Sequence, residues 1–391
     1  MPRELIEECY RASLVLLREN TTAAGILASA PNASSEGRNY TSIFGRDASI
    51  CALGMIASGE PDLARAARDG LLTLAAHQAP NGQIPKFVKP QLQEADFWYS
   101  GCIDATLWWL IALRFLELRL PEQPLPPELT EKSARALRWL ECQEHQNWYL
   151  LQQNEASDWA DIMPRSGFVL YSNALWYWTK RLYHLPSAGQ TRHFANLLLA
   201  PFDDAVPEQR RVRLFRHYVR NSCPATPFYL SFVNLSLWGE EIDIFGNILA
   251  HLTGLSDPSC AGAAITRLLA LRASDPYPVR VVGRPIEPQS PQWRRYMSRH
   301  RQNLPWQYHN GGIWPFVGGF WLLLLIRQGR EKLAWDELEK LARANRVNRW
   351  EFNEWFHGQT GEPMGMARQS WNAALFILAY RALLNGERFI P

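Results

Sequence analysis

Two carboxylic acids in this sequence, Asp161 and Glu354, have neighbours suited to acid–base chemistry. Asp161 is bordered by Trp159, Ile162 and Met163, and an apolar border of this kind raises the pKa of a carboxyl group, as a general acid requires. Glu354 precedes aromatic residues and suits a general base. Cleavage of an acetal needs one carboxyl group that protonates the leaving oxygen and a second that attacks carbon or activates water. The pair therefore predicts hydrolysis of a glycosidic bond.

Other acidic residues close to the pair keep its assignment open. Asp158 and Glu351 each stand three residues from a candidate, and periodicity excludes neither. Asp158 also suits a turn cap, because aspartate side chains commonly accept backbone N–H groups there. Asp47 stands beside Arg46, and the adjacent cation favours the ionised form of the carboxyl group. We therefore expect Asp47 to hydrogen-bond sugar hydroxyls.

Polar and aromatic residues in the same and in similar segments are candidates for substrate contacts. A lone histidine is more often a structural residue, so His309 suits either role, whereas Asn310 beside it suits a hydroxyl ligand. The predicted substrate-binding residues are Tyr40, Phe44, Arg46, Asp47, Asp104, Asp158, Trp159, Arg165, Asp243, Tyr308, His309, Asn310, Trp355, His357 and Gln369.

Helical periodicity dominates the sequence and predicts an all-α fold. Twelve helices are expected, near residues 4–19, 46–58, 61–77, 102–118, 127–143, 169–184, 187–201, 239–253, 258–273, 311–328, 330–346 and 368–385. Short pieces around 148–152 and 211–219 alternate like β-strands.

The expected helices alternate between two kinds. Odd-numbered helices are amphipathic, with an apolar stripe opposite charged residues, and should lie outside. Even-numbered helices are apolar on nearly all faces, as in the run LWWLIALRF from Leu107, and should lie inside. This alternation predicts six helical hairpins that close into an (α/α)6 double-layered barrel, with residues 1–391 as a single domain. An open helical solenoid is the alternative, but its repeats would resemble one another more closely.

A polar and aromatic segment precedes each of the six inner helices. The segments are 40–47, 97–104, 158–165, 238–243, 306–315 and 351–358. One such segment would be an ordinary N-cap, but six in phase with the inner helices indicate more than capping. Because the alternation makes the inner helices parallel, we expect all six segments to converge in one cleft at one end of the barrel.

Composition excludes several other classes of protein. The formal charge is +3 without a basic stripe, so nucleic acid is not an expected partner. The most apolar run contains a proline and is shorter than the ~20 residues that span a bilayer. The N-terminal segment also lacks the features of a secretion signal, and we expect a cytoplasmic protein without a membrane partner.

Cofactors and partners are limited in the same way. Six dispersed cysteines and nine dispersed histidines show no metal-ligand spacing. Proton transfer needs no cofactor, so neither a metal nor an organic cofactor is expected. The abundant tryptophan suits stacking on sugars or a large core, and a small carbohydrate is the expected partner. The sequence leaves assembly into a homo-oligomer open.

Four stretches resemble the neutral/alkaline invertase family and, more distantly, the amylo-α-1,6-glucosidase domain of glycogen-debranching enzymes. They are YTSIFGRDASICALGMIASGE from Tyr40, IDATLWWLIALR from Ile103, GNILAHLTGLSDP from Gly246 and YHNGGIWP from Tyr308. The resemblance implies an inverting (α/α)6 glycosidase that cleaves sucrose with an aspartate acid and a glutamate base. By position these residues are Asp161 and Glu354.

The sequence departs from the family pattern at both catalytic motifs. The loop around Asp161 differs by about one residue in spacing from the invertase pattern and is closer to the debranching glucosidases. The base motif has His357 where the family has aspartate, and it lacks the family's Trp-Pro before the glutamate. Sucrose is therefore the leading substrate, with an α-1,6 branch or a glycosylated compatible solute as alternatives. Two hypotheses come from different classes of protein: a sugar epimerase or isomerase that uses His309 or His357, and a carbohydrate-binding protein without catalysis.

Overall fold

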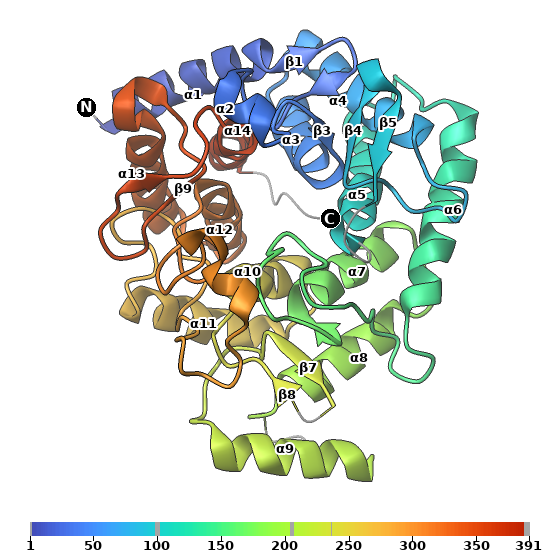
Figure 1. The fold of residues 1–391 in the computed structure, drawn as a ribbon, viewed down its shortest axis with the longest axis vertical. Coiled ribbons are helices and arrows are strands. Elements are labelled where there is room, and N and C mark those ends of the chain that lie inside the picture. The colour runs from blue at the N-terminus through green and yellow to red at the C-terminus, as the bar shows by residue number, and fades with distance from the viewer. Residues whose placement is uncertain (1, 98–101, 204–206, 236, 387–391) are drawn as a thin grey trace.

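The computed structural model describes residues 2–97, 102–203, 207–235 and 237–386. Figure 1 shows a ring of helices enclosed by a second ring, viewed along the barrel axis. In this part of the chain, none of the helices combines the length and the apolar character needed to cross a bilayer.

Six nearly fully buried helices form the inner ring. They are α3 (Gly45–Ala57), α5 (Ile103–Arg119), α7 (Leu170–Leu182), α10 (Ile244–Thr253), α12 (Pro315–Arg327) and α14 (Ser370–Asn385). Each packs against the next in chain order, and α14 packs against α3, which closes the ring. Because these helices lack a polar face, they are stable only when a second layer covers them.

Six amphipathic helices supply that outer layer. They are α1 (Pro2–Glu19), α4 (Pro61–Ala76), α6 (Pro127–Gln143), α8 (Ala188–Leu199), α11 (Pro258–Ala270) and α13 (Glu331–Trp350). Helices α4, α6, α8, α11 and α13 each pack on the inner helix before them, and α1 covers α14. The structure therefore confirms the twelve expected helices and the all-α, six-hairpin barrel.

Glycines set how closely three inner helices approach. A Cβ atom added at Gly54 of α3 would lie 2.0 Å from the carbonyl oxygen of Ala374 in α14. One added at Gly319 of α12 would lie 2.6 Å from the Cβ of Leu375 in α14. Any larger residue would push these backbones apart, because a close-packed interior has no spare volume to absorb it.

One sequence-based expectation about secondary structure was wrong. Residues 211–219 lie in a helix, α9 (Arg210–Ser222), which stands outside the barrel beside α8. Its buried residues are Val212, Arg216 and Val219, a spacing of four and three that suits a helix and not a strand. The piece around 148–152 contributes only an isolated bridge between Glu144 and Leu151. The short helices α2 (Ala33–Gly37), η1 (Pro90–Leu92) and η2 (Arg295–Arg301) were not expected.

Short antiparallel sheets join the loops of neighbouring hairpins. Their strands are β3 (Ile43–Phe44), β4 (Phe87–Lys89) and β5 (Glu94–Asp96) in one sheet, and β6 (Phe168–Val169), β7 (Phe232–Asn234) and β8 (Leu237–Trp238) in a second. Two strand pairs, β1 (Thr21–Thr22) with β2 (Gly25–Ile26) and β9 (Trp355–Phe356) with β10 (Pro363–Met364), complete the set. Because β3 and β6 lead directly into α3 and α7, these sheets fix the loops at the end of the barrel where the inner helices begin.

Candidate active site

Glu354 lies immediately before β9 and is only 3% exposed. The hydroxyl of Tyr40 donates a 2.6 Å hydrogen bond to Oε1, and the backbone N–H of Met366 donates one of 2.9 Å to Oε2. Gly365 leaves room for this carboxylate, since a Cβ there would stand 2.5 Å from Oε2. Burial raises the pKa of Glu354 to about 7, and the two hydrogen bonds oppose the rise. Such a group can accept a proton near neutral pH.

Asp161 lies in the loop before β6 and α7 (residues 154–167, the acid loop), and 30% of its side chain is exposed. Its Oδ2 is 3.7 Å from Nζ of Lys86, and its Oδ1 is 3.8 Å from Nδ1 of His309. Burial by the surrounding loops raises the pKa of Asp161, while the positive charges of Lys86 and Arg46 act against the rise. A carboxyl group that is open to solvent and holds its proton more tightly than usual suits a proton donor.

Asp158, the competing candidate, is engaged by its own loop. Its Oδ1 accepts a 2.8 Å hydrogen bond from the N–H of Ala160, and its Oδ2 accepts one of 2.9 Å from the side chain of Gln153. The residue is only 2% exposed. These bonds occupy both oxygens, as a turn cap does, so of the two aspartates Asp161 has the open carboxyl group.

Two buried tyrosines, Tyr40 and Tyr308, are affected by the charges of both candidate carboxyl groups. Burial raises the pKa of Tyr40 well above its ordinary value, and the charges of Glu354 and Asp161 add to the rise. The pKa of Tyr308 is raised in the same way, by burial and then by Asp161 and Glu354. The charges of Asp161 and Glu354 therefore both act on these two hydroxyl groups.

Arg46 links the first turns of α3 and α5. Its Nη2 is 3.1 Å from Oδ2 of Asp47, and its Nη1 is 3.5 Å from Oδ2 of Asp104. Asp104 also accepts a 3.2 Å hydrogen bond from the hydroxyl of Tyr171, which accepts one of 2.8 Å from the indole of Trp108. Burial raises the pKa of Asp104 to about 6 although Arg46 opposes the rise. The predicted Arg46–Asp47 pair is present, and the contacts of Arg46 with Asp104 and of Asp104 with Tyr171 connect it to the buried core.

His309 stands between Asp161 and an aromatic wall. Its ring stacks on Trp314, with centroids 5.2 Å apart, and meets the edge of Trp159 at 4.8 Å. Burial lowers the pKa of His309 well below its ordinary value, so the ring is neutral. Its Nδ1 has no hydrogen-bond partner among the described residues. Trp159 is only 2% exposed and packs behind the site.

Arg165 and Asp243, both predicted to bind substrate, form an ion pair with each other. Nη1 of Arg165 is 3.2 Å from Oδ2 of Asp243, and its Nε donates a 3.4 Å hydrogen bond to Oε1 of Glu241. All three side chains are at most 2% exposed. Burial raises the pKa of Asp243 to about 6, and Arg165 opposes the rise. This cluster ties the acid loop to the start of α10.

Three further candidates are held by protein groups. The side chain of Asn310 accepts from the N–H of Ile286 at 2.8 Å and donates to its carbonyl at 2.9 Å, which leaves its amide engaged in the loop. Nδ1 of His357 accepts from two N–H groups of the turn that follows it, each at 3.3 Å. Oε2 of Glu351 accepts from two asparagine side chains. These contacts give the three residues structural partners.

Gln369 has no such partner. It caps α14 and is completely buried, yet neither its side-chain oxygen nor its side-chain nitrogen has a hydrogen bond among the described residues. The buried indole N–H of Trp355 is also unpaired within that part of the chain, and its ring lies 5.8 Å from that of Tyr308. The ring of Phe44 lies 6.3 Å from that of Tyr40. Unpaired buried polar groups are costly, and sugar hydroxyls would suit them.

Two residues that contact predicted site residues, Lys86 and Trp371, carry no signal in the sequence. Lys86 is the nearest cation to Asp161, but it follows a proline in a loop before a strand, where no periodicity marks it. Trp371 in α14 lies under the guanidinium of Arg46, 5.7 Å from it, but resembles any other core tryptophan in an apolar run. In both cases the signal is spatial.

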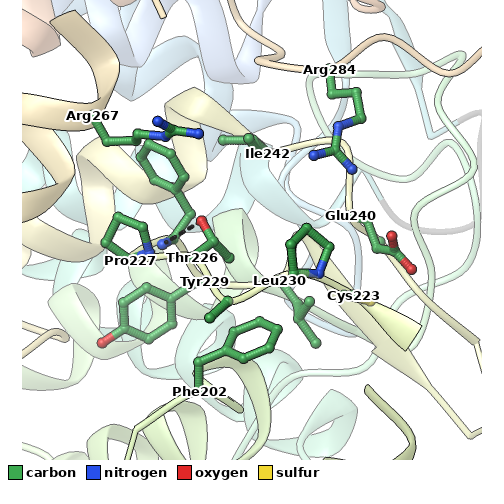
Figure 2. A pocket seen from close by; sticks show the side chains of 14 residues that line it. Phe202, Cys223, Thr226, Pro227, Tyr229, Leu230, Glu240, Ile242, Arg267 and Arg284 are labelled. Carbon is green, nitrogen blue, oxygen red and sulfur yellow. Dashed lines mark hydrogen bonds between the residues drawn. The ribbon is translucent and has the colours of Figure 1, made fainter. Parts of the chain in front are cut away.

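Some features lie outside the site or outside the described residues. Residues 98–101 of the predicted segment 97–104 are not described. Nowhere in the described ranges do three or more potential metal ligands gather. A separate cavity of about 410 Å³ is lined by Phe202, Cys223, Tyr229, Glu240 and others (Figure 2), and it contains none of the predicted catalytic or substrate-binding residues.

Comparison with known proteins shows similarity in sequence and in fold. Residues 242–386 match the family model described as alkaline and neutral invertase. Cytosolic invertase 1 of Oryza sativa subsp. japonica is 24% identical over 95% of this chain and 76% of its own length. Probable alkaline/neutral invertase D of Arabidopsis thaliana is 25% identical over 97% of this chain and 82% of its own. The match to probable alkaline/neutral invertase A of the same plant covers only 23% of that protein, at 27% identity.

Among solved structures, the mannosylglycerate hydrolase of Thermus thermophilus, a GH63 enzyme, superposes with a TM-score of 0.63. The two chains are 15% identical, and the match covers 95% of this chain and 99% of the other. The barrel and these relatives define a glycoside hydrolase with a six-hairpin fold. Within that class the chain is related to the alkaline and neutral invertases, which confirms the resemblance noted in its motifs.

Proposed function

We propose that the chain is an inverting hydrolase of a small α-glucoside, with sucrose as the leading substrate, Asp161 as general acid and Glu354 as general base. One observation carries the proposal: a buried glutamate whose two oxygens accept hydrogen bonds from Tyr40 and Met366 lies in a loop before one inner helix, and an aspartate open to solvent lies in the loop before another. The names of the invertase relatives support sucrose.

In this mechanism each carboxyl group moves one proton. Asp161 donates its proton to the glycosidic oxygen as the bond to the anomeric carbon breaks. Glu354 takes a proton from water, whose oxygen bonds to that carbon from the opposite face and inverts its configuration. The two carboxyl groups must stand about 6.5–9.5 Å apart to leave room for this water.

The test compares D161N and E354Q with wild type on sucrose. Loss of an acid or a base should lower kcat about 100- to 10,000-fold. E351Q is the matched control, three residues from Glu354, and should retain most activity. D158N tests the competing aspartate and should lose less activity than D161N. Proton NMR of the first glucose released should show the β-anomer. Activity retained in both D161N and E354Q, or release of the α-anomer, contradicts the proposal.

A second candidate function, hydrolysis of a glucoside with an anionic aglycone such as a glycosylated compatible solute, is favoured by Lys86. A general acid stands where the leaving group departs, so Lys86 at 3.7 Å from Asp161 places positive charge beside that group. The solved Thermus relative is a mannosylglycerate hydrolase and was solved with D-glycerate.

A substrate panel separates these two candidates from each other and from debranching, epimerisation and binding without catalysis. Sucrose, isomaltose and glucosylglycerate are compared for wild type, K86M and K89M, the last being the next lysine in the same segment. A K86M loss confined to glucosylglycerate supports the second candidate, and rapid isomaltose cleavage supports debranching activity. Sugar isomerised without release of a product supports an epimerase, for which neutral His309 would be a weak base. Binding without turnover supports a carbohydrate-binding protein.

We further propose that residues 1–391 form one barrel domain in the cytoplasm. One hydrophobic cluster runs through all twelve helices of the two layers. All six cysteines are free, as is usual in a reducing compartment, and the rice relative is named a cytosolic invertase. Fractionation followed by immunodetection tests the compartment, and sedimentation velocity measures the oligomeric state.

A further inference from the structure

Residues 271–314 form a long connection between α11 and α12 that reaches the acid loop. It includes η2 and crosses the end of the barrel where the inner helices begin, beside the loop that precedes α7 (Figure 1). Two contacts join this connection to the acid loop. One is at the rim, where Arg294 and Tyr296 bind the carboxylate of Glu155. The other is buried and centres on Asn303.

Asn303 is completely buried, and its side chain connects two loops. Its Nδ2 donates a 2.8 Å hydrogen bond to the carbonyl of Ile162, the residue after Asp161. Its Oδ1 accepts a 2.9 Å hydrogen bond from the N–H of Asn310, the residue after His309. The side-chain amide of Asn303 therefore bonds to the residue after Asp161 and to the residue after His309. Oδ1 of Asp161 and Nδ1 of His309 lie 3.8 Å apart.

The carboxyl group of Asp161 depends on such support because its own contacts are long. Lys86 and His309 stand 3.7 and 3.8 Å from its oxygens, beyond ordinary hydrogen-bond length. The position of the carboxyl group is therefore set mainly by the backbone of its loop. Asp158 and Gln153 fix the start of this loop, and Asn303 fixes its far side.

We propose that Asn303 is a positioning residue for the general acid, which it holds through the carbonyl of Ile162 and the loop of His309. This inference rests on the proposed role of Asp161 as acid. Misplacement of a catalytic group by about 1 Å costs up to about 100-fold in rate. Loss of Asn303 should therefore weaken the step that needs the acid and spare the step that needs the base.

Two substrates separate these steps. Sucrose, or the best unactivated α-glucoside of the panel, needs protonation of its leaving oxygen, whereas α-glucosyl fluoride releases fluoride with little help from an acid. The ratio of the two rates measures the acid alone, and it does not depend on the fraction of enzyme that is folded. For D161N this ratio should fall strongly, whereas E354Q should lose both activities.

For N303A and N303D we expect the ratio to fall about 10- to 100-fold, with fluoride hydrolysis within about threefold of wild type. N303D keeps the acceptor for Asn310 but removes the donor to the carbonyl of Ile162 and to Sδ of Met163, so it tests the acid-loop side of the contact and serves if N303A folds poorly. N196A is the matched control, since the amide of Asn196 also donates a 2.8 Å bond to a backbone carbonyl, that of Leu255, beyond the other end of α10.

The outcomes distinguish this inference from the proposed function. An unchanged ratio in N303A and N303D beside a reduced ratio in D161N overturns the role of Asn303 and leaves the acid in place. An unchanged ratio in D161N overturns the acid and the inference with it. An equal fall of the ratio in N196A would show a general effect of lost packing and also overturn the inference.

Discussion

The hydroxyl of Tyr40 donates a 2.6 Å hydrogen bond to Oε1 of Glu354, joining residues 314 positions apart in the chain. Tyr40 belongs to the segment before α3 and Glu354 to the segment before α14, and these two helices close the inner ring. Closure of the barrel therefore creates the setting of the proposed base. Since the phenol stabilises the ionised carboxylate, it also sets the pH at which the base is ready.

Substitution of Tyr40 by phenylalanine should move the acidic limb of the kcat/KM profile to higher pH. A general base must be ionised, so activity rises as pH passes the pKa of Glu354, which is about 7. Y40F removes a hydrogen bond that lowers this pKa, and the pKa rises further. A rate profile from about pH 5 to pH 9 measures the shift.

Y183F is the matched control, because the hydroxyl of Tyr183 donates a 2.9 Å bond to the backbone carbonyl of Leu110 in α5 and not to a carboxylate. Its profile should coincide with that of wild type. An acidic limb that stays in place or moves to lower pH in Y40F contradicts the assignment of Glu354 as base.

Substitution of Glu354 by glutamine should change the pH dependence of stability. Burial raises the pKa of Glu354 from 4.5 to about 7, so the folded state binds this proton more tightly than the unfolded state. The stabilisation is complete below about pH 4.5 and is lost as pH rises through about 7. Relative to E354Q, the free energy of unfolding of wild type should fall by about 3 kcal/mol across this window.

Urea unfolding at several pH values measures this difference. The lost contacts of E354Q with Tyr40 and Met366 add an offset that does not vary with pH, so the slope carries the test. As the reference variant, E351Q is unfolded in urea at the same pH values. A difference between wild type and E354Q that is constant with pH would contradict the raised pKa.

Substitution of Arg165 by methionine should destabilise the fold. Arg165 is paired with Glu241 and Asp243 in a fully buried cluster, and removal of the cation leaves two buried carboxylates without compensation. Such a loss costs about 3–5 kcal/mol. R114M is the control, because Arg114 and Glu117 form a partly exposed pair worth at most about 1 kcal/mol. Equal losses of unfolding free energy in R165M and R114M, measured by urea unfolding, would show that the Arg165 cluster does not stabilise the fold.

Substitution of Gln369 by methionine should weaken substrate binding without lowering the stability of the fold. The buried amide has no described partner, so an apolar side chain of similar length should leave the free energy of unfolding unchanged or increase it. If sugar hydroxyls satisfy this amide, KM should rise about 10-fold or more. Q78M is the opposite case, because the amide of Gln78 donates to two backbone carbonyls. Q78M should therefore lower the free energy of unfolding and leave KM unchanged. An unchanged KM in Q369M would show that Gln369 does not bind the substrate.

The sequence by itself determined the barrel. Hydrophobic periodicity is a local property, and it located the twelve helices and separated inner from outer ones, because a helix such as α5 that lacks a polar face must be covered. Periodicity failed at α9, where valines at helical spacing within an arginine-rich segment resembled strand alternation. Local composition also marked the chemical types of the site, including Asp161 and Glu354.

Only the tertiary structure decided which side chains are free. Asp158 and Asp161 share one loop, but hydrogen bonds from Gln153 and Ala160 occupy the first and leave the second open. Lys86 and Asn303 come from loops far away in the sequence and carry no periodic signal. Side-chain directions in irregular loops are set by long-range hydrogen bonds and by closure of the ring, and neither can be read from neighbouring residues.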